Sequence, residues 1–205
     1  MKKLKIKITF EEPVLGTSPR NEELFTDYVA SKAPDVKSME EEIEAMGAAA
    51  VAEKGMTIFP RNAEGQPILW DYQVKGFFKD SCQMLAKLGG SGKDKKPVNE
   101  SSKIKAYKKV IDGLIFVFPR QIVLNYPGEI GICQRPLRAQ TMQGERVALT
   151  MSEELPAGTT AELEIMCMDD AHEAAVREWL DYGALRGIGQ WRNSGKGRFS
   201  WKVIE

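Results

Sequence analysis

The feature that most constrains this chain is the alternation of apolar and polar residues in its strand-like segments. Four apolar residues from Leu4 to Phe10 alternate with three lysines and a threonine, and similar alternation occurs over residues 160–167 and 198–203. Successive side chains of a strand point to opposite faces, so each of these strands has one apolar and one polar face. A sheet built from them is covered on one face only, which is typical of antiparallel α+β folds.

Helices are predicted between these strands. Apolar residues at helical spacing predict one helix over residues 74–88 and another over residues 171–184, the second with Asp170 as its N-cap. Earlier in the chain, helices are expected over residues 21–30 and 38–52, the latter strongly acidic.

The segments between these helices and strands are less regular. β-Branched and aromatic residues predict strands over residues 113–119 and 121–126, and a short helix is expected over residues 104–110. Residues 89–102 are polar and rich in glycine and lysine, which predicts a mobile loop. Residues 131–150 are basic and are expected to be irregular.

The charges cancel over the whole chain but not along it. Lysine and arginine total 29, as do aspartate and glutamate, so the formal net charge is zero. Residues 35–53 carry six acids and one base, residues 87–109 carry eight lysines and two acids, and residues 186–202 carry five bases and no acid. A neutral total disfavours strong, indiscriminate DNA binding but leaves room for a local basic track. We therefore expect a two-sided molecule whose acidic helix lies away from the basic C-terminal segment.

The three cysteines indicate a reducing compartment. Cys82, Cys133 and Cys167 are widely spaced and odd in number, which argues against a disulfide framework and predicts a cytoplasmic protein. No CxxC or HxxxH pairing suggests a zinc site. The single histidine, His172, lies at a predicted helix start, where a capping or surface role is favoured over general-base catalysis. No secretory signal and no apolar run of about 18 residues is present, so no membrane partner is expected.

The most informative stretch lies between the last predicted helix and the last predicted strand. Four glycines fall within eleven residues there, together with Trp191, Arg192, Lys196 and Arg198. We call residues 187–198 the glycine loop. Its spacing matches neither nucleotide-binding fingerprint, and the preceding helix presents its C-terminus, the wrong dipole end for a phosphate cradle. One interpretation is a basic loop that binds phosphates and stacks a base on Trp191; the other is an ordinary helix C-cap and turn with Trp191 in the core.

Three segments together resemble a known family. The glycine loop is similar to the glycine-rich loop before the last strand of RAMP-superfamily proteins, the repeat-associated subunits and processing enzymes of CRISPR ribonucleoproteins. Residues 69–79 are similar to the family's short loop followed by Lys-Gly at a helix start, except that Gln73 stands where Ser or Thr is common. Residues 153–159 are similar to the segment that leads into a later strand. The chain also resembles small phage-encoded proteins of unassigned role.

This resemblance implies both a fold and a binding mode. The implied fold is a ferredoxin-like, RNA-recognition-motif-like α+β core: an antiparallel sheet with helices packed on one face and a glycine-rich loop before the last strand. It would form a single domain over residues 1–205, alternatively two fused β–α–β half-domains. Single-stranded RNA would bind along the open sheet face, where Lys3, Lys5 and Lys7 are expected, beside the glycine loop.

Three functions are consistent with these features. The first is non-catalytic binding of single-stranded RNA or DNA, RNA preferred, without metal or cofactor. Its predicted binding residues offer a positive charge for phosphates or a ring for bases: Lys75, Lys79, Arg135, Arg138, Arg186, Trp191, Arg192, Lys196 and Arg198. The second is a protein–protein module that stacks with itself or docks on a CRISPR-type ribonucleoprotein, for example as an inhibitor. The third is a RAMP-type endoribonuclease, which the scarcity of histidine disfavours.

Overall fold

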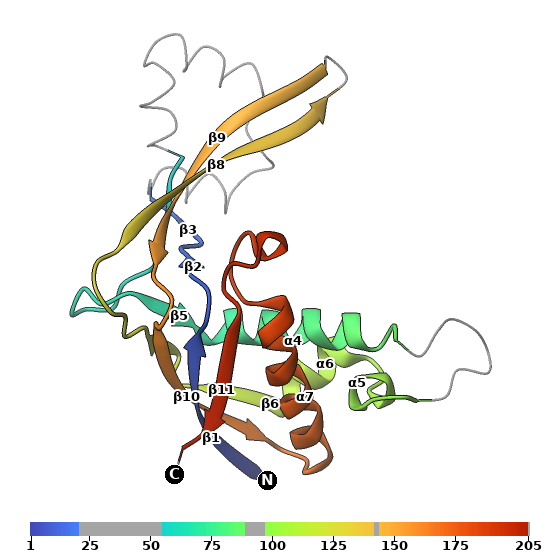
Figure 1. The fold of residues 1–205 in the computed structure, drawn as a ribbon. Coiled ribbons are helices and arrows are strands. Elements are labelled where there is room, and N and C mark those ends of the chain that lie inside the picture. Colours follow the sequence, from blue (N-terminus) through green and yellow to red (C-terminus); the bar gives the residue numbers. More distant parts are fainter. Residues whose placement is uncertain (21–54, 89–96, 142–143, 205) are drawn as a thin grey trace.

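The structure is a computed structural model of the 205-residue chain (Figure 1). It describes residues 1–20, 55–88, 97–141 and 144–204, with the backbone alone over 137–141 and 144–149. The helices predicted over residues 21–30 and 38–52 lie outside the described residues, as do residues 89–96 of the predicted mobile loop.

The central sheet has four antiparallel strands in the order β11-β1-β10-β6. These strands are β1 (Lys2–Phe10), β6 (Ile115–Phe118), β10 (Thr160–Cys167) and β11 (Phe199–Val203). Helix α4 (Asp71–Leu85) lies between β1 and β6 in the chain, and α7 (Ala171–Arg186) lies between β10 and β11. This β–α–β–β–α–β succession is consistent with a ferredoxin-like fold. The predicted α+β class with an antiparallel sheet is confirmed.

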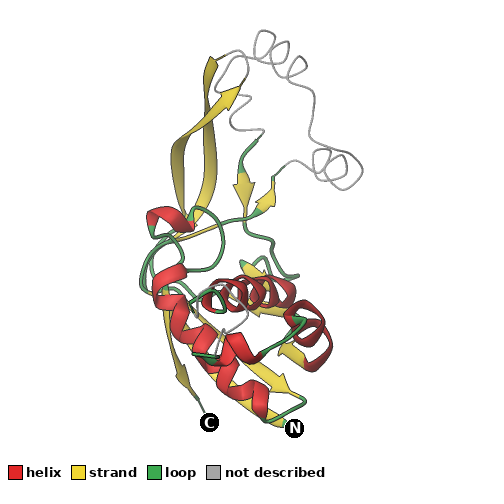
Figure 2. Cartoon of the chain, turned by 90° about the vertical axis from the view of Figure 1, so that its right-hand side faces the viewer, coloured by secondary structure: helices red, strands yellow, loops and turns green. Residues whose placement is uncertain are grey.

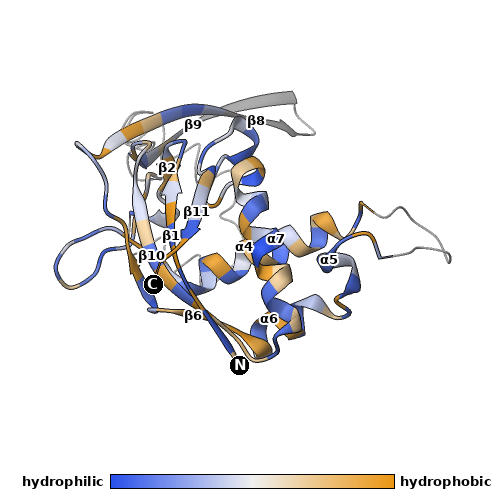
Figure 3. Cartoon of the chain, turned by 60° about the horizontal axis from the view of Figure 1, so that its bottom comes forward, coloured by the Kyte–Doolittle hydropathy of each residue, from blue (hydrophilic) through white to orange (hydrophobic). Residues whose placement is uncertain are grey.

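The alternation in β1 separates a buried face from an open one. Leu4, Ile6, Ile8 and Phe10 are buried, and they join residues of α4 and α7 in one hydrophobic core. The intervening residues of β1 are exposed or half-buried. The helices lie on one face of the sheet (Figures 1 and 2). Polar and apolar residues alternate in patches along α4 and α7, as expected for helices with one buried side (Figure 3).

Helix α7 follows its predicted stripe with two differences. Val176, Trp179, Leu180 and Gly183 are buried, but Ala184, the last member of the predicted stripe, is exposed. A Cβ on Gly183 would lie 2.2 Å from the Phe199 ring, so glycine allows α7 to pack closely on β11. The predicted Asp170 side-chain cap is wrong: the side chain of Asp169 accepts from the Ala171 amide at 2.9 Å instead.

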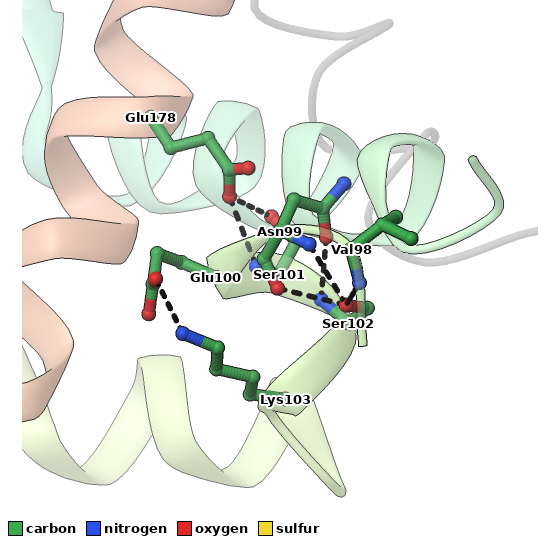
Figure 4. A network of polar contacts seen from close by, with 7 residues as sticks. All are labelled: Val98, Asn99, Glu100, Ser101, Ser102, Lys103 and Glu178. Carbon is green, nitrogen blue, oxygen red and sulfur yellow. Dashed lines mark hydrogen bonds and ion pairs between the residues drawn. The ribbon is translucent and has the colours of Figure 1, made fainter. Parts of the chain in front are cut away.

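Part of the predicted mobile loop is helical. Residues Glu100–Lys103 form α5, whose first turn is capped by the Asn99 side chain, which accepts from the Ser102 amide at 2.8 Å (Figure 4). Ser101 is buried and donates its hydroxyl to Glu178 of α7 at 2.7 Å. This polar network holds α5 against α7. The neighbouring helix, α6, covers Tyr107–Leu114, later in the chain than predicted.

The prediction that residues 131–150 are irregular is wrong. Strands β8 (Gly131–Thr141) and β9 (Gly144–Leu155) form a long antiparallel hairpin that extends beyond the helices (Figure 1). Residues 131–134 of β8 are half-buried or exposed on both faces, so the apolar alternation that marks a strand is missing. Pro136 is tolerated because β8 is an edge strand among the described strands, where it pairs with β9 only.

Short strands complete the architecture. The base of β9 is flanked by β2 (Val14–Leu15) and β4 (Thr57–Ile58), and β3 (Ser18–Pro19) pairs with β4. Strands β5 (Ile68–Trp70) and β7 (Gln121–Val123) form a separate ribbon before α4 and after β6. No helix in the described part of the chain is long and apolar enough to cross a membrane.

Candidate nucleic-acid interface

The glycine loop is closed by backbone contacts between its two ends. The Ile188 amide donates to the Gly197 carbonyl at 2.9 Å, and the Gly197 amide donates to Pro13 after β1 at the same distance. A Cβ on Gly197 would lie 2.0 Å from the Ile188 oxygen, and one on Gly187 would lie 2.6 Å from the Lys196 oxygen. Both glycines also have φ of +72°. Glycine is therefore required here for close approach and for a left-handed backbone.

An acidic residue of α4 ties the loop to the helical layer. The Asp80 carboxylate accepts from Arg186 Nε at 2.8 Å and from Arg192 Nη1 at 2.7 Å, and all three side chains are half-buried. Burial raises the pKa of Asp80, but the hydrogen bonds and charges of the two arginines outweigh it and hold that pKa below its ordinary value. The same hydrogen bond raises the pKa of Arg186. These arginines are therefore positioned, and partly neutralised, by one carboxylate.

A second acid binds the C-terminal part of the glycine loop. Lys196 Nζ lies 2.8 Å from Glu154 Oε2 on β9, and both side chains are half-buried. The charges of this pair affect the thiol of Cys133 on β8. Burial raises the pKa of that thiol, Glu154 raises it further, and Lys196 lowers it. The glycine loop is thus attached to the base of the β8–β9 hairpin as well as to α4.

Arg135 joins the hairpin to the tip of the loop. Its side chain is 4% exposed, and its Nη2 donates to Gln190 Oε1 at 2.7 Å. The guanidinium carbon lies 5.3 Å from the centroid of the Trp191 ring, within cation–π range. Its Nε and Nη1 are buried, and no described residue forms a hydrogen bond with either atom.

Two predicted residues present their side chains to solvent. Trp191 is 40% exposed, so the interpretation that packs it in the core is wrong. It adopts φ +52°, a left-handed backbone that is uncommon for a bulky residue. Arg198 is also exposed, and no described residue pairs with its side chain. An aromatic ring and a free guanidinium are therefore available on the same loop.

The remaining three predicted residues lie outside this group. Lys79 is 2.6 Å from Asp112 of α6, and Lys75 donates to the Asp112 carbonyl at 3.3 Å and lies 4.9 Å from the Phe116 ring. These lysines thus contact α6 and β6 rather than the glycine loop. Arg138 lies opposite Val147 in the hairpin, where the backbone alone is described.

The open face of the central sheet is less basic than expected. Lys3 lies 3.4 Å from Glu164, and Lys7 lies 3.6 Å from Glu162, both acids on the neighbouring strand β10. Lys3, Lys5 and Lys7 are exposed or half-buried on this face, as predicted, but the two glutamates balance part of their charge.

The same open face holds an aromatic side chain that the sequence prediction did not single out. Phe118 is 46% exposed and lines a shallow hollow of about 390 Å³ together with Lys5 and Glu164. The signal for it was the alternation of Phe116 and Phe118 with buried residues in β6. Stacking of a base needs such a ring, so Phe118 is a candidate that extends the site along the sheet.

A second hollow, of about 230 Å³, lies between α4 and the glycine loop. Its lining includes Thr17, Gln73, Gly76 and Arg192. Gln73, the residue that departs from the family pattern, accepts from the Trp70 amide at 2.8 Å and donates to Thr17 at 2.7 Å. It therefore caps α4 and fixes the segment after β2, both of which border this hollow.

In the described ranges, no group of three or more histidine, cysteine, aspartate or glutamate side chains is placed to hold a metal ion. His172 lies in the first turn of α7, and its buried Nδ1 has no hydrogen-bond partner among the described residues.

No protein-family model matches this sequence, and no curated protein matches it. Among solved structures, the fold is similar to that of a chain in the cryo-EM structure of the Type III-B Cmr-beta bound to cognate target RNA. The TM-score is 0.51 at 11% sequence identity, and the match covers 100% of this chain and 61% of that one. A chain of a Type IV-B CRISPR complex matches with a TM-score of 0.48 at 13% identity, over 99% of this chain and 90% of the other. The first likeness shows that this protein shares the fold of a chain from the Cmr-beta structure.

Proposed function

We propose that this protein binds single-stranded nucleic acid, RNA in preference to DNA, without catalysing a reaction, as a component or docking partner of a CRISPR-type ribonucleoprotein. The observation that carries the proposal is the exposed Trp191 ring on the glycine loop, next to the guanidinium of Arg135 and on the same loop as that of Arg198. An aromatic platform flanked by cations suits strands whose bases are free to stack.

The charge around the loop supports moderate rather than strong affinity. Five predicted cations lie there, and two carboxylates, Asp80 and Glu154, partly neutralise them, which leaves three positive charges. Each phosphate contact on a single strand contributes about −0.7 to the slope of log K against log salt. We expect a slope of about −2 for the loop alone, and a steeper one if Lys75 and Lys79 also contact the strand.

The fold comparison adds context to this proposal. The chain of similar fold comes from a structure described as bound to cognate target RNA. This protein spans 61% of the length of that chain, so its RNA contacts and partners are part of the proposal.

The test is a binding titration with the full chain. Fluorescein-labelled single-stranded RNA and DNA of one sequence, and the same RNA as a duplex, would be titrated by anisotropy between 50 and 200 mM salt. Trp191→Ala should weaken single-strand binding by about 5- to 150-fold, the usual range for a stacked base. Arg198→Ala should weaken binding and reduce the slope by about 0.7, because one phosphate contact is lost.

The matched control removes one positive charge elsewhere. Lys108 of α6 is exposed, so Lys108→Ala changes the net charge by as much as Arg198→Ala without touching the loop. Its affinity and slope should equal those of the wild type. If no oligonucleotide binds in a salt-dependent manner, or if all three variants behave alike, nucleic-acid binding at this loop is refuted.

A second candidate function is docking on a protein partner through the hairpin. The β8–β9 hairpin extends beyond the helical layer (Figure 1). Ile132, near the start of β8, is 58% exposed. Isolation of a stoichiometric protein partner, with an absorbance ratio that shows no nucleic acid, would favour this function. Ile132→Asp should then abolish co-purification, whereas it should leave oligonucleotide binding at the glycine loop unchanged.

A further inference from the structure

Arg135 is a buried cation whose hydrogen bonds are incomplete. Arg135 is 4% exposed, and its Nη2 donates to Gln190 Oε1 at 2.7 Å. Its Nε and Nη1 are buried and have no partner among the residues that the structure describes. Guanidinium groups offer donors and no acceptor, and buried ones are normally paired with carboxylates or fully hydrogen-bonded. An arginine left in this state destabilises the free protein unless something else uses its donors.

The acids in this region are already engaged by other cations. Glu154 bonds Lys196 at 2.8 Å, and Asp80 bonds Arg186 and Arg192. In the described part of the chain, no ion pair joins Arg135 to a carboxylate. The unpaired donors are therefore available for an anion that is not part of these described residues.

Trp191 covers this guanidinium in a strained conformation. Its ring centroid lies 5.3 Å from the guanidinium carbon, and its backbone has φ +52°. Left-handed backbone at a bulky residue persists only when surrounding contacts enforce it. Gly189 and Gly195, both with φ +91°, lie on either side of Trp191 and give the loop tip backbone freedom.

We propose that Arg135 and Trp191 form a nucleotide subsite that opens on binding. In the free protein the Trp191 ring covers the guanidinium; with a bound strand, the ring moves to stack on a base, and Nε and Nη1 bond the adjacent phosphate. The ligand class is a nucleotide within a single strand. This inference deepens the proposed function and rests on it.

The driving force comes from the difference between the two states. Binding satisfies two buried donors that the free protein leaves unpaired, and it releases a left-handed residue from its enforced position. A ligand shifts such an equilibrium only by its differential affinity for the two forms, and these contacts exist only in the open one. Trp191 therefore opposes a bare phosphate, which cannot stack, and favours a nucleotide, which can.

The first experiment separates a ligand role of Arg135 from a structural one. Arg135→Met removes the charge but keeps an apolar chain of similar reach, and Lys108→Met is the charge-matched control. We expect the free Arg135→Met protein to melt at the same temperature as the wild type or higher, because a poorly paired buried charge is lost. Its affinity for a single-stranded RNA 20-mer should fall at least tenfold, and the salt slope should shrink by about 0.7.

The second experiment uses opposite effects on two probes. Trp191→Gly removes the cover, the ring and the backbone strain. It should bind inorganic pyrophosphate several-fold more tightly than the wild type, measured by calorimetry, and single-stranded RNA more weakly. Adding Arg135→Met should abolish the pyrophosphate gain.

The outcomes distinguish this inference from the proposed function. The subsite is refuted, while RNA binding stands, if Arg135→Met melts several degrees lower than the wild type and binds RNA with the same affinity. It is also refuted if Trp191→Gly shifts the affinities for pyrophosphate and RNA in the same direction, or shifts neither. If the wild type binds no oligonucleotide, the proposed function fails, and the nucleotide subsite fails with it.

Discussion

Asp80 is the best single position at which to test how the glycine loop is held. Its carboxylate receives hydrogen bonds from Arg186 at 2.8 Å and from Arg192 at 2.7 Å, and its side chain is 27% exposed. Asp80→Asn removes the negative charge while keeping the shape. A hydrogen bond to a charged group contributes about 1.5–3 kcal/mol. Asp80 forms one such bond to each of the two arginines. The site is partly exposed and asparagine retains one acceptor, so we expect each bond to contribute near the lower limit. The free energy of unfolding should therefore fall by about 2–3 kcal/mol in total.

The assay is thermal unfolding followed by circular dichroism at several pH values. For a chain of this length, about 1 kcal/mol shifts the Tm by roughly 2–4 °C, so Asp80→Asn should lower Tm by roughly 4–12 °C at pH 7. The folded-state pKa of Asp80 lies below its ordinary value of 3.8, so its stabilisation is present above that value and is lost as pH falls through the folded pKa. The difference between wild type and variant should therefore close in acid.

The control is an acid in an exposed ion pair. Glu162 lies 3.6 Å from Lys7 and is 60% exposed, and Glu162→Gln should change stability by less than about 0.5 kcal/mol. Equal Tm values for Asp80→Asn and wild type at pH 7 would refute the argument. A difference that persists undiminished at the most acidic pH at which the protein still folds would refute its electrostatic origin.

Two further predictions concern stability. Gly197→Ala should lower the free energy of unfolding, measured in urea, by more than about 2 kcal/mol, because its Cβ would lie 2.0 Å from the Ile188 oxygen. The control is Gly128→Ala, at a similar φ of +75° with no atom within 4 Å of its Cβ, which should cost only about 1–2 kcal/mol. Equal losses for the two variants would contradict the close approach at Gly197. Burial raises the pKa of the Cys82 and Cys167 thiols to about 11. The stabilisation from the protonated thiols should therefore be complete below pH 9.0 and decline between pH 9 and 11. A Cys82→Ala/Cys167→Ala protein whose stability declines equally steeply over this range would contradict the prediction.

Elements with one buried face could be predicted from the sequence, and the β8–β9 hairpin could not. Strand β1 and helix α7 display their periodicity because the same residues that set the pattern also form the core. Residues 131–134 of β8 have no buried face, so their sequence carries no such pattern and their strand is defined by pairing with β9. Helix α5 was missed for a similar reason: its stability depends on Glu178, which lies 77 residues from Ser101.

The cations of the candidate site could be predicted, but their partners could not. Arginines and a tryptophan in a glycine-rich segment are visible as local composition. The contacts that decide which of them stay available join residues far apart: Arg192 meets Asp80 at a separation of 112 residues, and Arg135 meets Gln190 at a separation of 55. Among the described residues, two donors of Arg135 stay unpaired, while Asp80 and Glu154 pair with other cations of the loop region.

The sequence by itself thus determined the α+β class, the two faces of the sheet and the position of a basic, glycine-rich loop, because hydrophobic periodicity and local composition act over a few residues. The tertiary structure decided the hairpin, the partial neutralisation of the loop and the placement of Trp191 over a buried guanidinium. These features depend on which side chains, far apart in the sequence, the fold brings within a few ångströms of one another. Ion pairing and burial are decided by contacts over such short distances.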